Sequence, residues 1–178
     1  MYALRPERAV DTPEVEDLLD LCFAPGRTAL SSYRLREGVP PVPGLCLVLR
    51  DSHDVMVGAI RFWPVHVADE DVLLLGPVAV HPTAQGEGLG GLLIREGLWR
   101  AEMQGWARVM LVGDEPYYRR FGFRKLEHVQ MPPPTNPDRV LGLELEPGAW
   151  QGVEGQVMRD TTDNEASGEA WRNIGGRS

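Results

Sequence analysis

Lysine and cysteine are scarce in this chain of 178 residues, and long apolar runs are missing. Lys125 is the only lysine among 18 Lys and Arg residues, an imbalance that we attribute to genome composition. The two cysteines, Cys22 and Cys46, are far apart and each lies inside an apolar stretch. We therefore expect buried free thiols, with neither a disulfide nor a metal site.

The lack of long apolar runs and of positive net charge argues against two kinds of partner. No run reaches the roughly 18 residues that a membrane helix needs, and the start Met-Tyr-Ala-Leu-Arg-Pro does not resemble a secretory leader. We expect a cytoplasmic protein with no membrane partner. A formal net charge of −8 argues against nucleic acid as a partner.

Length and composition predict one domain followed by a tail. A chain of 178 residues can bury one hydrophobic core, and a hydrophobic fraction of 43% is ordinary for such a protein. From Gln151 onward Gly, Glu, Asp, Asn, Thr and Ser dominate. We therefore expect a domain over 1–150 and a loose or irregular tail over 151–178.

The most informative stretch runs from Val78 to Gly91. The apolar run Val72–Val80 predicts a buried strand that ends before Pro82, and residues 92–103 predict a helix. The turn between them is dense in glycine, which lets a backbone approach a ligand closely. Free N–H groups at the start of a helix attract anions. The stretch therefore predicts a phosphate-binding loop.

One interpretation of this loop is a dinucleotide site. Residues 86–91, Gly-Glu-Gly-Leu-Gly-Gly, match the G-x-G-x-x-G fingerprint, and Asp114 follows a second apolar strand. However, residues 81–85 separate the first glycine from its strand, and no second mononucleotide-binding half is visible. A dinucleotide-dependent oxidoreductase is therefore the weaker alternative.

The rest of the chain predicts an antiparallel meander with one helical crossover. Short turns between successive strands favour antiparallel pairing, and the helix after the loop leads to a parallel partner strand. Gly105 is well placed to terminate that helix. The expected strands are 2–4, 45–50, 55–67, 72–80, 108–112, 123–129 and 140–145. We expect four helices. The first has Thr12 as its N-cap and ends at a terminator over 24–26. A weaker candidate covers 27–36, and two further helices cover 88–104 and 115–120.

Two motifs resemble a known acyltransferase family. Gln85-x-x-Gly88-x-Gly90, five residues after a strand end, resembles the pyrophosphate loop of the GNAT N-acetyltransferase superfamily, whose pattern is Gln/Arg-x-x-Gly-x-Gly/Ala. The run 118–123, Tyr-Arg-Arg-Phe-Gly-Phe, resembles the family's second motif, Tyr-x-x-x-Gly-Phe. The sequence of residues 113–118 is most similar to that of the bacterial YhbS-like predicted N-acetyltransferases. The resemblance covers about residues 1–150.

The resemblance implies a fold and an activity. The fold would be α/β (α+β), with a mixed, mostly antiparallel sheet of about six or seven strands, about four flanking helices, and a splayed parallel pair near 72–80 and 108–112. Acetyl-CoA would be the co-substrate, without a metal, and the acetyl group would pass directly to a primary amine in a ternary complex. The acceptor would be a small molecule or a peptide amine, and the protein a monomer or a homodimer. A non-catalytic module that senses acyl-CoA is an alternative.

The family's cofactor-binding positions carry over to one strand end and one loop. Backbone N–H groups of the loop would face the two phosphates, and main-chain groups of the strand would face the pantetheine arm. Glu87 itself would point to solvent. The cofactor-binding residues implied are Val78, Ala79, Val80, Gln85, Gly86, Glu87, Gly88, Leu89, Gly90 and Gly91.

Tyr118 is the catalytic candidate. In the family this tyrosine lies near the thioester sulfur and returns a proton to the departing thiolate. A phenol with a pKa near 10 is protonated at neutral pH, which suits an acid. The alternative is a purely structural aromatic, a role that Tyr117 fits better because it lies outside the motif.

The general base is not identified by the sequence. Many relatives have a carboxylate eleven residues before the glutamine and an asparagine seven before the tyrosine, but Leu74 and Leu111 occupy these positions. Asp114, Glu115 or His81 could act through a water molecule. Each of the three is more simply interpreted as a solvated surface residue.

Overall fold

The structure, a computed structural model, describes residues 1–23, 27 and 31–160. In this part of the chain nine strands form a sheet in the order β1-β2-β3-β4-β5-β8-β6, with β9 pairing with β3 and β7. The strands are β1 (Ala3–Pro6), β2 (Leu47–Arg50), β3 (Met56–Val67), β4 (Glu70–Val80), β5 (Arg108–Val112), β6 (Arg124–Lys125), β7 (Val129–Gln130), β8 (Val140–Glu144) and β9 (Gly155–Arg159). The helices are α1 (Thr12–Cys22), α2 (Ser31–Arg34), α3 (Leu89–Met103) and α4 (Glu115–Tyr118). Short 3-10 turns are η1 (Ala9–Asp11), η3 (Pro82–Ala84), η4 (Arg119–Phe121) and η5 (Pro137–Arg139).

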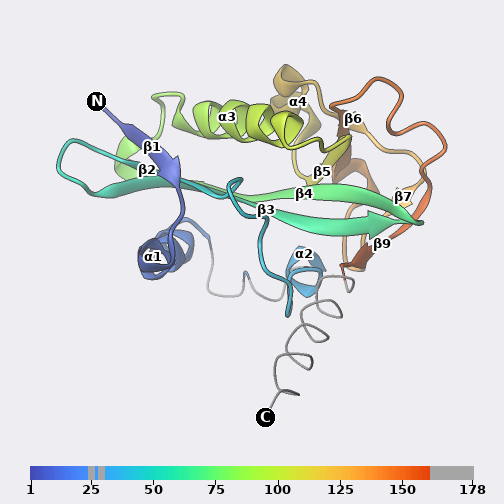
Figure 1. The fold of residues 1–178 in the computed structure, drawn as a ribbon, viewed down its shortest axis with the longest axis horizontal. Coiled ribbons are helices and arrows are strands. Elements are labelled where there is room, and N and C mark those ends of the chain that lie inside the picture. The colour runs from blue at the N-terminus through green and yellow to red at the C-terminus, as the bar shows by residue number, and fades with distance from the viewer. Residues whose placement is uncertain (24–26, 28–30, 161–178) are drawn as a thin grey trace, which may run out of the picture.

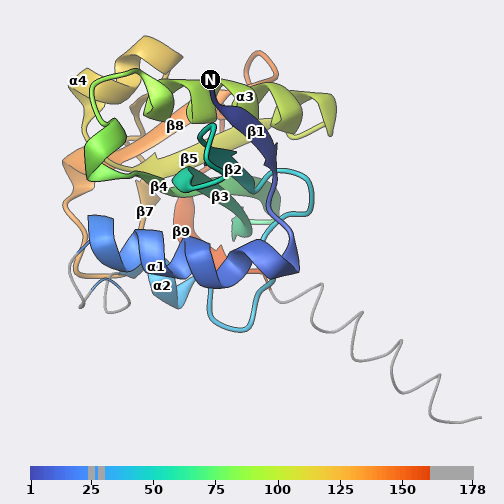
Figure 2. The same ribbon diagram turned by 90° about the vertical axis from the view of Figure 1, so that its left-hand side faces the viewer.

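Helices cover both faces of the sheet. Helices α3 and α4 lie on one face, and α1 and α2 lie on the other (Figures 1 and 2). Side chains of β2 alternate accordingly, because successive residues of a strand point to opposite faces. Leu47 and Leu49 pack in the core that includes α3, whereas Val48 packs with Val15 and Leu19 of α1. The site described below is lined by strands β4 and β5 and by residues from the helical layers on both faces.

The centre of the sheet contains the predicted parallel pair. Strands β4 and β5 pair in parallel at Leu73–Val109 and Leu74–Met110, and the other neighbours in the path from β1 to β6 are antiparallel. Outside this path the short β7 pairs in parallel with β9. A doubly wound dinucleotide-binding sheet is mostly parallel. The mixed sheet therefore disfavours the dinucleotide interpretation.

A bulge in β4 makes the two central strands diverge. The register of β4 with β3 shifts between Ile60–Val78 and Phe62–Leu75, so that Gly76 and Pro77 oppose a single residue of β3. The indole nitrogen of Trp63 donates to the Gly76 carbonyl at 2.8 Å and stabilises this irregular segment. Beyond the bulge, the described part of β4 has β3 as its partner but not β5. The splayed pair expected near 72–80 and 108–112 is confirmed.

Helix ends follow from local sequence, with one correction. Gly105, at φ +90°, ends α3 as predicted, because the Trp106 N–H donates to Ala101 O across it. The predicted N-cap Thr12 is wrong. Turn η1 runs directly into α1, so Asp11 precedes the helix and its carboxylate accepts the Arg8 N–H at 2.8 Å.

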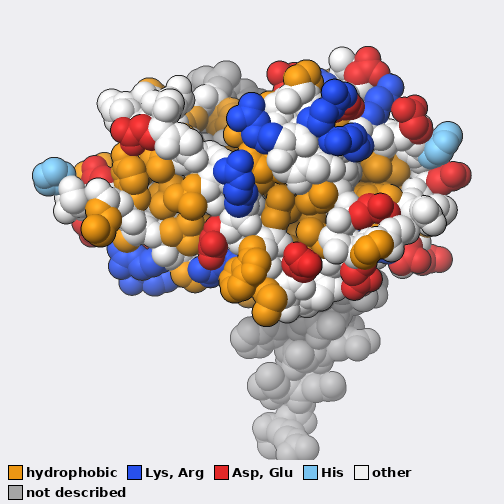
Figure 3. Space-filling view, turned by 90° about the horizontal axis from the view of Figure 1, so that it is seen from above, with side chains coloured by type: hydrophobic (Ala, Val, Ile, Leu, Met, Phe, Trp, Pro, Cys, Tyr) orange, Lys and Arg blue, Asp and Glu red, His pale blue; other side chains and the backbone are white. Residues whose placement is uncertain are grey.

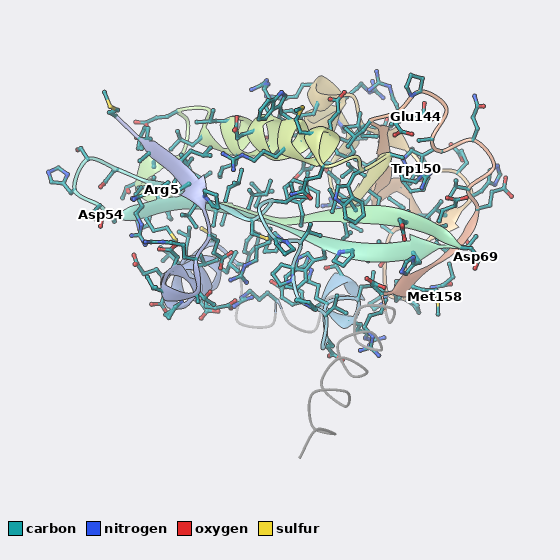
Figure 4. The ribbon with its side chains drawn as sticks, in the orientation of Figure 1. Arg5, Asp54, Asp69, Glu144, Trp150 and Met158 are labelled. Atoms are coloured by element: carbon teal, nitrogen blue, oxygen red, sulfur yellow. The ribbon has the colours of Figure 1, made fainter. Side chains whose placement is uncertain are left out.

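Two other expectations need correction near the C-terminal end. The single strand expected over 123–129 is wrong, because the chain forms β6, which pairs with β8, and then β7, which pairs with β9. The expected loose tail is also wrong for residues 155–159, which form a strand. Strand β9 pairs with β3, and Val157 is buried against Val65 and Val67. In Figure 4, Met158 on β9 lies beside the β3–β4 turn that carries Asp69. Glu144 lies close to Trp150, and its carboxylate accepts the main-chain N–H of Trp150.

The remaining expectations concern the N-terminal region and the tail end. Helix α2 represents part of the helical candidate expected over 27–36. Three stretches lie outside the described residues, namely the terminator at 24–26, residues 28–30 and the tail over 161–178. Cys46 is buried, Cys22 is partly buried, and both thiols are free. Within the described part of the chain, no helix combines the length and hydropathy of a membrane span.

Candidate active site

Two cavities meet where β4 and β5 diverge. The loop cavity, of about 590 Å³, is lined by residues 84–86 and 88–91 together with side chains of α3 and η4. The sheet cavity, of about 540 Å³, is lined by β4, the end of β5 and residues near α2. Val78, Tyr117 and Tyr118 line both cavities. A ligand could therefore extend from one cavity into the other.

The glycine-rich part of the loop cavity is lined by backbone. Gly86 and Gly88 have φ of +88° and +76°, in the region where glycine is favoured. A Cβ atom built at either position would meet no atom within 4 Å, so the space outside these glycines is free. Gly88 is the N-cap of α3, and the first N–H groups of a helix have no partner within it. The arrangement suits a pyrophosphate group.

The side chains of Gln85 and His81 form hydrogen bonds to the main chain at the start of the loop. The Gln85 amide donates to Val80 O at 3.2 Å and ties the loop to the end of β4. His81 Nδ1 accepts the Thr83 N–H at 3.2 Å and caps turn η3. His81 does not appear among the described residues that line either cavity. Its position is that of a turn residue at the start of η3.

The main chain of β4 supplies the wall between the cavities. The His81 N–H donates to Val57 O of β3 at 2.8 Å. Because main-chain groups of a strand alternate between its two edges, those of Val78 and Val80 point away from β3 and toward the gap left by β5. Peptide groups at this edge can bind an extended ligand in the manner of an added strand.

Two of the ten expected cofactor-binding residues belong to the same strand and loop but do not line the loop cavity. Ala79 is buried among residues of α1 on the opposite face of the sheet. Glu87 is exposed and accepts a hydrogen bond from the Tyr2 hydroxyl. Neither is among the residues that line the loop cavity, whereas the other eight are.

Tyr118 is held between aromatic rings and a glycine. Its ring packs edge-to-face on Tyr117, with centroids 4.9 Å apart, and on Phe123 at 5.9 Å. A Cβ atom at Gly113 would come within 2.5 Å of the ring, so only glycine fits there. Burial raises the pKa of Tyr118 to about 12. The hydroxyl therefore keeps its proton at neutral pH and can donate it.

Tyr117 and Tyr118 have similar packing, although the sequence suggested a structural role for Tyr117 and a catalytic role for Tyr118. Tyr117 and Tyr118 both pack against the main core, and both line the two cavities. The Tyr117 hydroxyl lies 3.6 Å from the position of a Cβ atom on Gly90. Tyr117 therefore packs against the core, as the sequence suggested, and also lines both cavities.

Sequence reasoning missed two arginines of the loop cavity. Arg95 and Arg120 line it, and their guanidinium groups lie over the rings of Phe121 and Tyr117 at 5.1 and 4.5 Å. Arg95 follows Gly91 by four residues, a spacing that places both on one face of α3. That spacing could have identified it. Figure 3 shows basic side chains gathered on the face that carries α3 and α4.

The sheet cavity contains one carboxylate among the described residues that line it. This is Asp114, whose Oδ1 lies 3.2 Å from the guanidinium of Arg139, and both side chains are largely exposed. Glu115 is not part of the lining and pairs with Arg119. Leu74 and Leu111 form an apolar part of the wall. The described lining of the sheet cavity therefore includes the protonated phenol of Tyr118 but no unpaired carboxylate.

Comparison with known proteins agrees with this geometry. The family described as "Acetyltransferase (GNAT) domain" matches residues 43–125. The chain is 35% identical over 127 residues to the "Uncharacterized N-acetyltransferase YhbS" of Escherichia coli K12, which covers 70% of this chain and 75% of that protein.

Two solved structures are similar over nearly the whole chain. A crystal structure of the GNAT family N-acetyltransferase YhbS from Escherichia coli in complex with CoA has a TM-score of 0.77 at 30% identity and covers 92% of both chains. A GNAT family acetyltransferase from Brucella melitensis in complex with acetyl-CoA has a TM-score of 0.69 at 28% identity and covers 90% of this chain and 97% of that one.

These similarities extend the resemblance from two motifs to most of the chain. The predicted GNAT fold and the similarity to the YhbS-like acetyltransferases are both confirmed. The chain belongs to the GNAT acetyltransferase family.

Proposed function

We propose that the protein transfers an acetyl group from acetyl-CoA to a primary amine, directly and in a ternary complex. The observation that carries the proposal is the shared wall of the two cavities. Because Tyr118 and Val78 line both, a thioester entering from the loop cavity would meet an amine entering from the sheet cavity beside the Tyr118 hydroxyl. Holding both reactants in one geometry removes much of the entropic barrier.

The reaction would use few protein groups. The amine nitrogen attacks the thioester carbonyl carbon, the carbon–sulfur bond breaks, and Tyr118 donates its proton to the departing thiolate. The acceptor ammonium first loses a proton to solvent, directly or through a water molecule near Asp114, because only the neutral amine can attack. The nitrogen of the adduct loses a second proton by the same route as the amide forms, and Tyr118 regains its proton from solvent. The loop between Gln85 and Gly91 holds the pyrophosphate and takes no part in bond breaking.

Two observations support acetyl-CoA as the donor. The loop cavity presents an open helix N-terminus with Arg95 and Arg120 beside it, which suits a ligand with phosphate groups. The Escherichia coli and Brucella melitensis relatives are complexes with CoA and acetyl-CoA, respectively.

A second candidate is an acyl-CoA sensor without turnover. It is favoured by one observation, the lack of a free carboxylate among the described residues of the sheet cavity. A sensor would bind acetyl-CoA as an enzyme does but would release no CoA thiol when amines are added.

Calorimetry and turnover together test the proposal. We expect acetyl-CoA and CoA to bind and NAD(P) to bind far more weakly, and we expect a panel of primary amines to include at least one that releases CoA thiol. Binding without turnover on a broad panel would favour the sensor. Equal or tighter binding of NAD(P) would contradict both functions.

A further inference from the structure

Arg36 lies in the sheet cavity and has no counter-ion among residues 1–23, 27 and 31–160. Its guanidinium stacks on the Tyr33 ring at 4.4 Å and lies 5.5 Å from the Trp63 ring. Nε and Nη1 are buried and have no hydrogen-bond partner among the described residues. Nη2 is directed at Gly76, 3.6 Å from the position of a Cβ atom there. Gly76 is also part of the cavity wall, so the charge faces the space that a ligand would fill.

The arginines that are buried as whole residues in the described chain are neutralised, whereas Arg36 is partly buried with two buried nitrogens. Arg27, Arg50 and Arg61 are each buried and each contacts two carboxylates within about 3 Å. The partners are Glu16 and Asp20 for Arg27, Asp11 and Glu14 for Arg50, and Glu7 and Glu16 for Arg61. The fold thus pairs its buried guanidinium groups, and Arg36 departs from that rule.

An unpaired buried charge destabilises a protein unless a ligand compensates it. Burial lowers the pKa of Arg36 to about 10, so the group still carries its charge at neutral pH. The other charged groups of the cavity wall do not balance it. Arg27 and Arg139 are paired, and Asp114, the one described carboxylate of the wall, is engaged with Arg139.

We propose that the acceptor is an amine that also carries a carboxylate, as an amino acid does, and that Arg36 binds this carboxylate. The inference rests on the proposed function and specifies its acceptor. A planar guanidinium matches the geometry of a carboxylate, and the contact would neutralise Arg36 while the amine points toward Tyr118. Amines with further cations, such as polyamines, would bring positive charge toward an unpaired arginine and should be poor acceptors.

Matched substrates test the proposal. The probes are the common amino acids, each paired with its decarboxylated amine and its methyl ester, and the rate is followed as CoA thiol release. A hydrogen-bonded ion pair of this kind is worth about tenfold to a hundredfold in affinity. We expect kcat/KM for the best amino acid to exceed that of its decarboxylated amine and its ester by this factor.

The variants are Arg36→Met, Arg36→Lys and the control Arg34→Met at the end of α2, two residues before Arg36. The Arg34 side chain is exposed and contacts Pro133 O. Arg36→Met should remove the preference for the carboxylate and leave the affinity for acetyl-CoA unchanged. Arg36→Lys should retain part of it, and Arg34→Met all of it. A wild-type preference for the decarboxylated amines, or an equal loss on all three substrates in Arg36→Met, would overturn the proposal.

Binding separates this inference from the proposed function. If no amine is turned over, N-acetylated amino acids are titrated into the CoA complex of the parent protein and of Arg36→Lys. Binding that is tenfold or more weaker in Arg36→Lys would support the carboxylate site even though acetyl transfer had failed. Equal binding in both proteins, or no binding to the parent, would overturn it.

Discussion

The two cavities share a wall but are built from different parts of the chain. The loop cavity takes nearly half of its lining from one segment, from Ala84 to Gly91, and the glycines of that segment can contribute only backbone. The sheet cavity is made by side chains that range from Phe23 to Arg139 in the sequence. The first site is therefore visible as a spacing of glycines, whereas the second exists only after the strands have paired.

The two cavities also differ in how far water screens their positive charges. Cations of the loop cavity, Arg95 and Arg120, are exposed and screened by solvent. Arg36 of the sheet cavity is partly desolvated and has no carboxylate partner among the described residues. A charge in such a place discriminates between ligands far more strongly than a charge in water. We infer that the loop cavity holds an invariant donor and that the sheet cavity selects the acceptor.

The largest effect is expected where the cavities meet. Tyr118→Phe keeps the ring and its edge-to-face contacts but removes the proton donor. We expect kcat to fall about 10²- to 10⁴-fold, with the affinity for acetyl-CoA nearly unchanged, because the lost interaction forms only as the thiolate leaves. Steady-state kinetics with a known acceptor, together with calorimetry, measure the two quantities.

Tyr117→Phe is the matched control for this variant, because Tyr117 lines the same two cavities. We expect its kcat to stay within a fewfold of the parent value, and the reverse ranking of the two variants would exchange their roles. Burial raises the pKa of Tyr118 to about 12. Any alkaline fall of kcat that is due to Tyr118 should therefore lie near that value rather than near 10, the value for an exposed phenol.

The next largest effect concerns the loop cavity alone. Gly88→Ala places a methyl group in the open space at the start of α3 and strains a residue with positive φ. We expect acetyl-CoA to bind at least about tenfold more weakly, since a side chain would stand between backbone and phosphate. Calorimetry provides the affinity.

Gly105→Ala controls for backbone strain. Gly105 has φ +90° and equally open surroundings, but it ends α3 away from the loop. Both variants should lose about 1 kcal/mol of unfolding free energy, the approximate cost of a left-handed alanine. If they weaken acetyl-CoA binding equally, the loop does not hold the phosphates.

The sequence predicted the backbone-built features and missed most of those that depend on tertiary contacts. The strand β4, the glycine turn and helix α3 are local, and each follows from apolar runs and glycine positions. In contrast, β9 was missed because the composition around it is polar, and its order comes from pairing with β3. Arg36 gave no signal at all, because its lack of a partner is a property of the folded cavity.

A smaller effect should separate packing in the site from packing in the core. Gly113→Ala would bring a methyl group within 2.5 Å of the Tyr118 ring, and Gly97→Ala would do the same to the Phe62 ring under α3. Both should lower the free energy of unfolding by about 1–3 kcal/mol through overpacking.

Only the variant in the site should affect the reaction. Displacing Tyr118 in Gly113→Ala should lower kcat about tenfold, since small misplacements of catalytic groups reduce rates strongly. Gly97→Ala should leave kcat unchanged at temperatures where it is folded. Denaturant unfolding and single-turnover rates measure both, and an unchanged kcat in Gly113→Ala would mean that the position of Tyr118 is not limiting.

The smallest effect is expected for the exposed cations of the loop cavity. If the phosphates are held mainly by backbone N–H groups, Arg95→Ala removes only a solvent-screened attraction, whose contribution is about 0.2–1 kcal/mol, or up to about fivefold in affinity. That small loss should shrink further in high salt, whereas the loss in Gly88→Ala should not. Calorimetry at two salt concentrations makes this comparison. A loss from Arg95→Ala as large as that from Gly88→Ala would show that side-chain charge, not backbone, holds the donor. Both cavities would then bind their ligands through charged side chains, and the contrast between a backbone-built site and a side-chain-built site would be smaller.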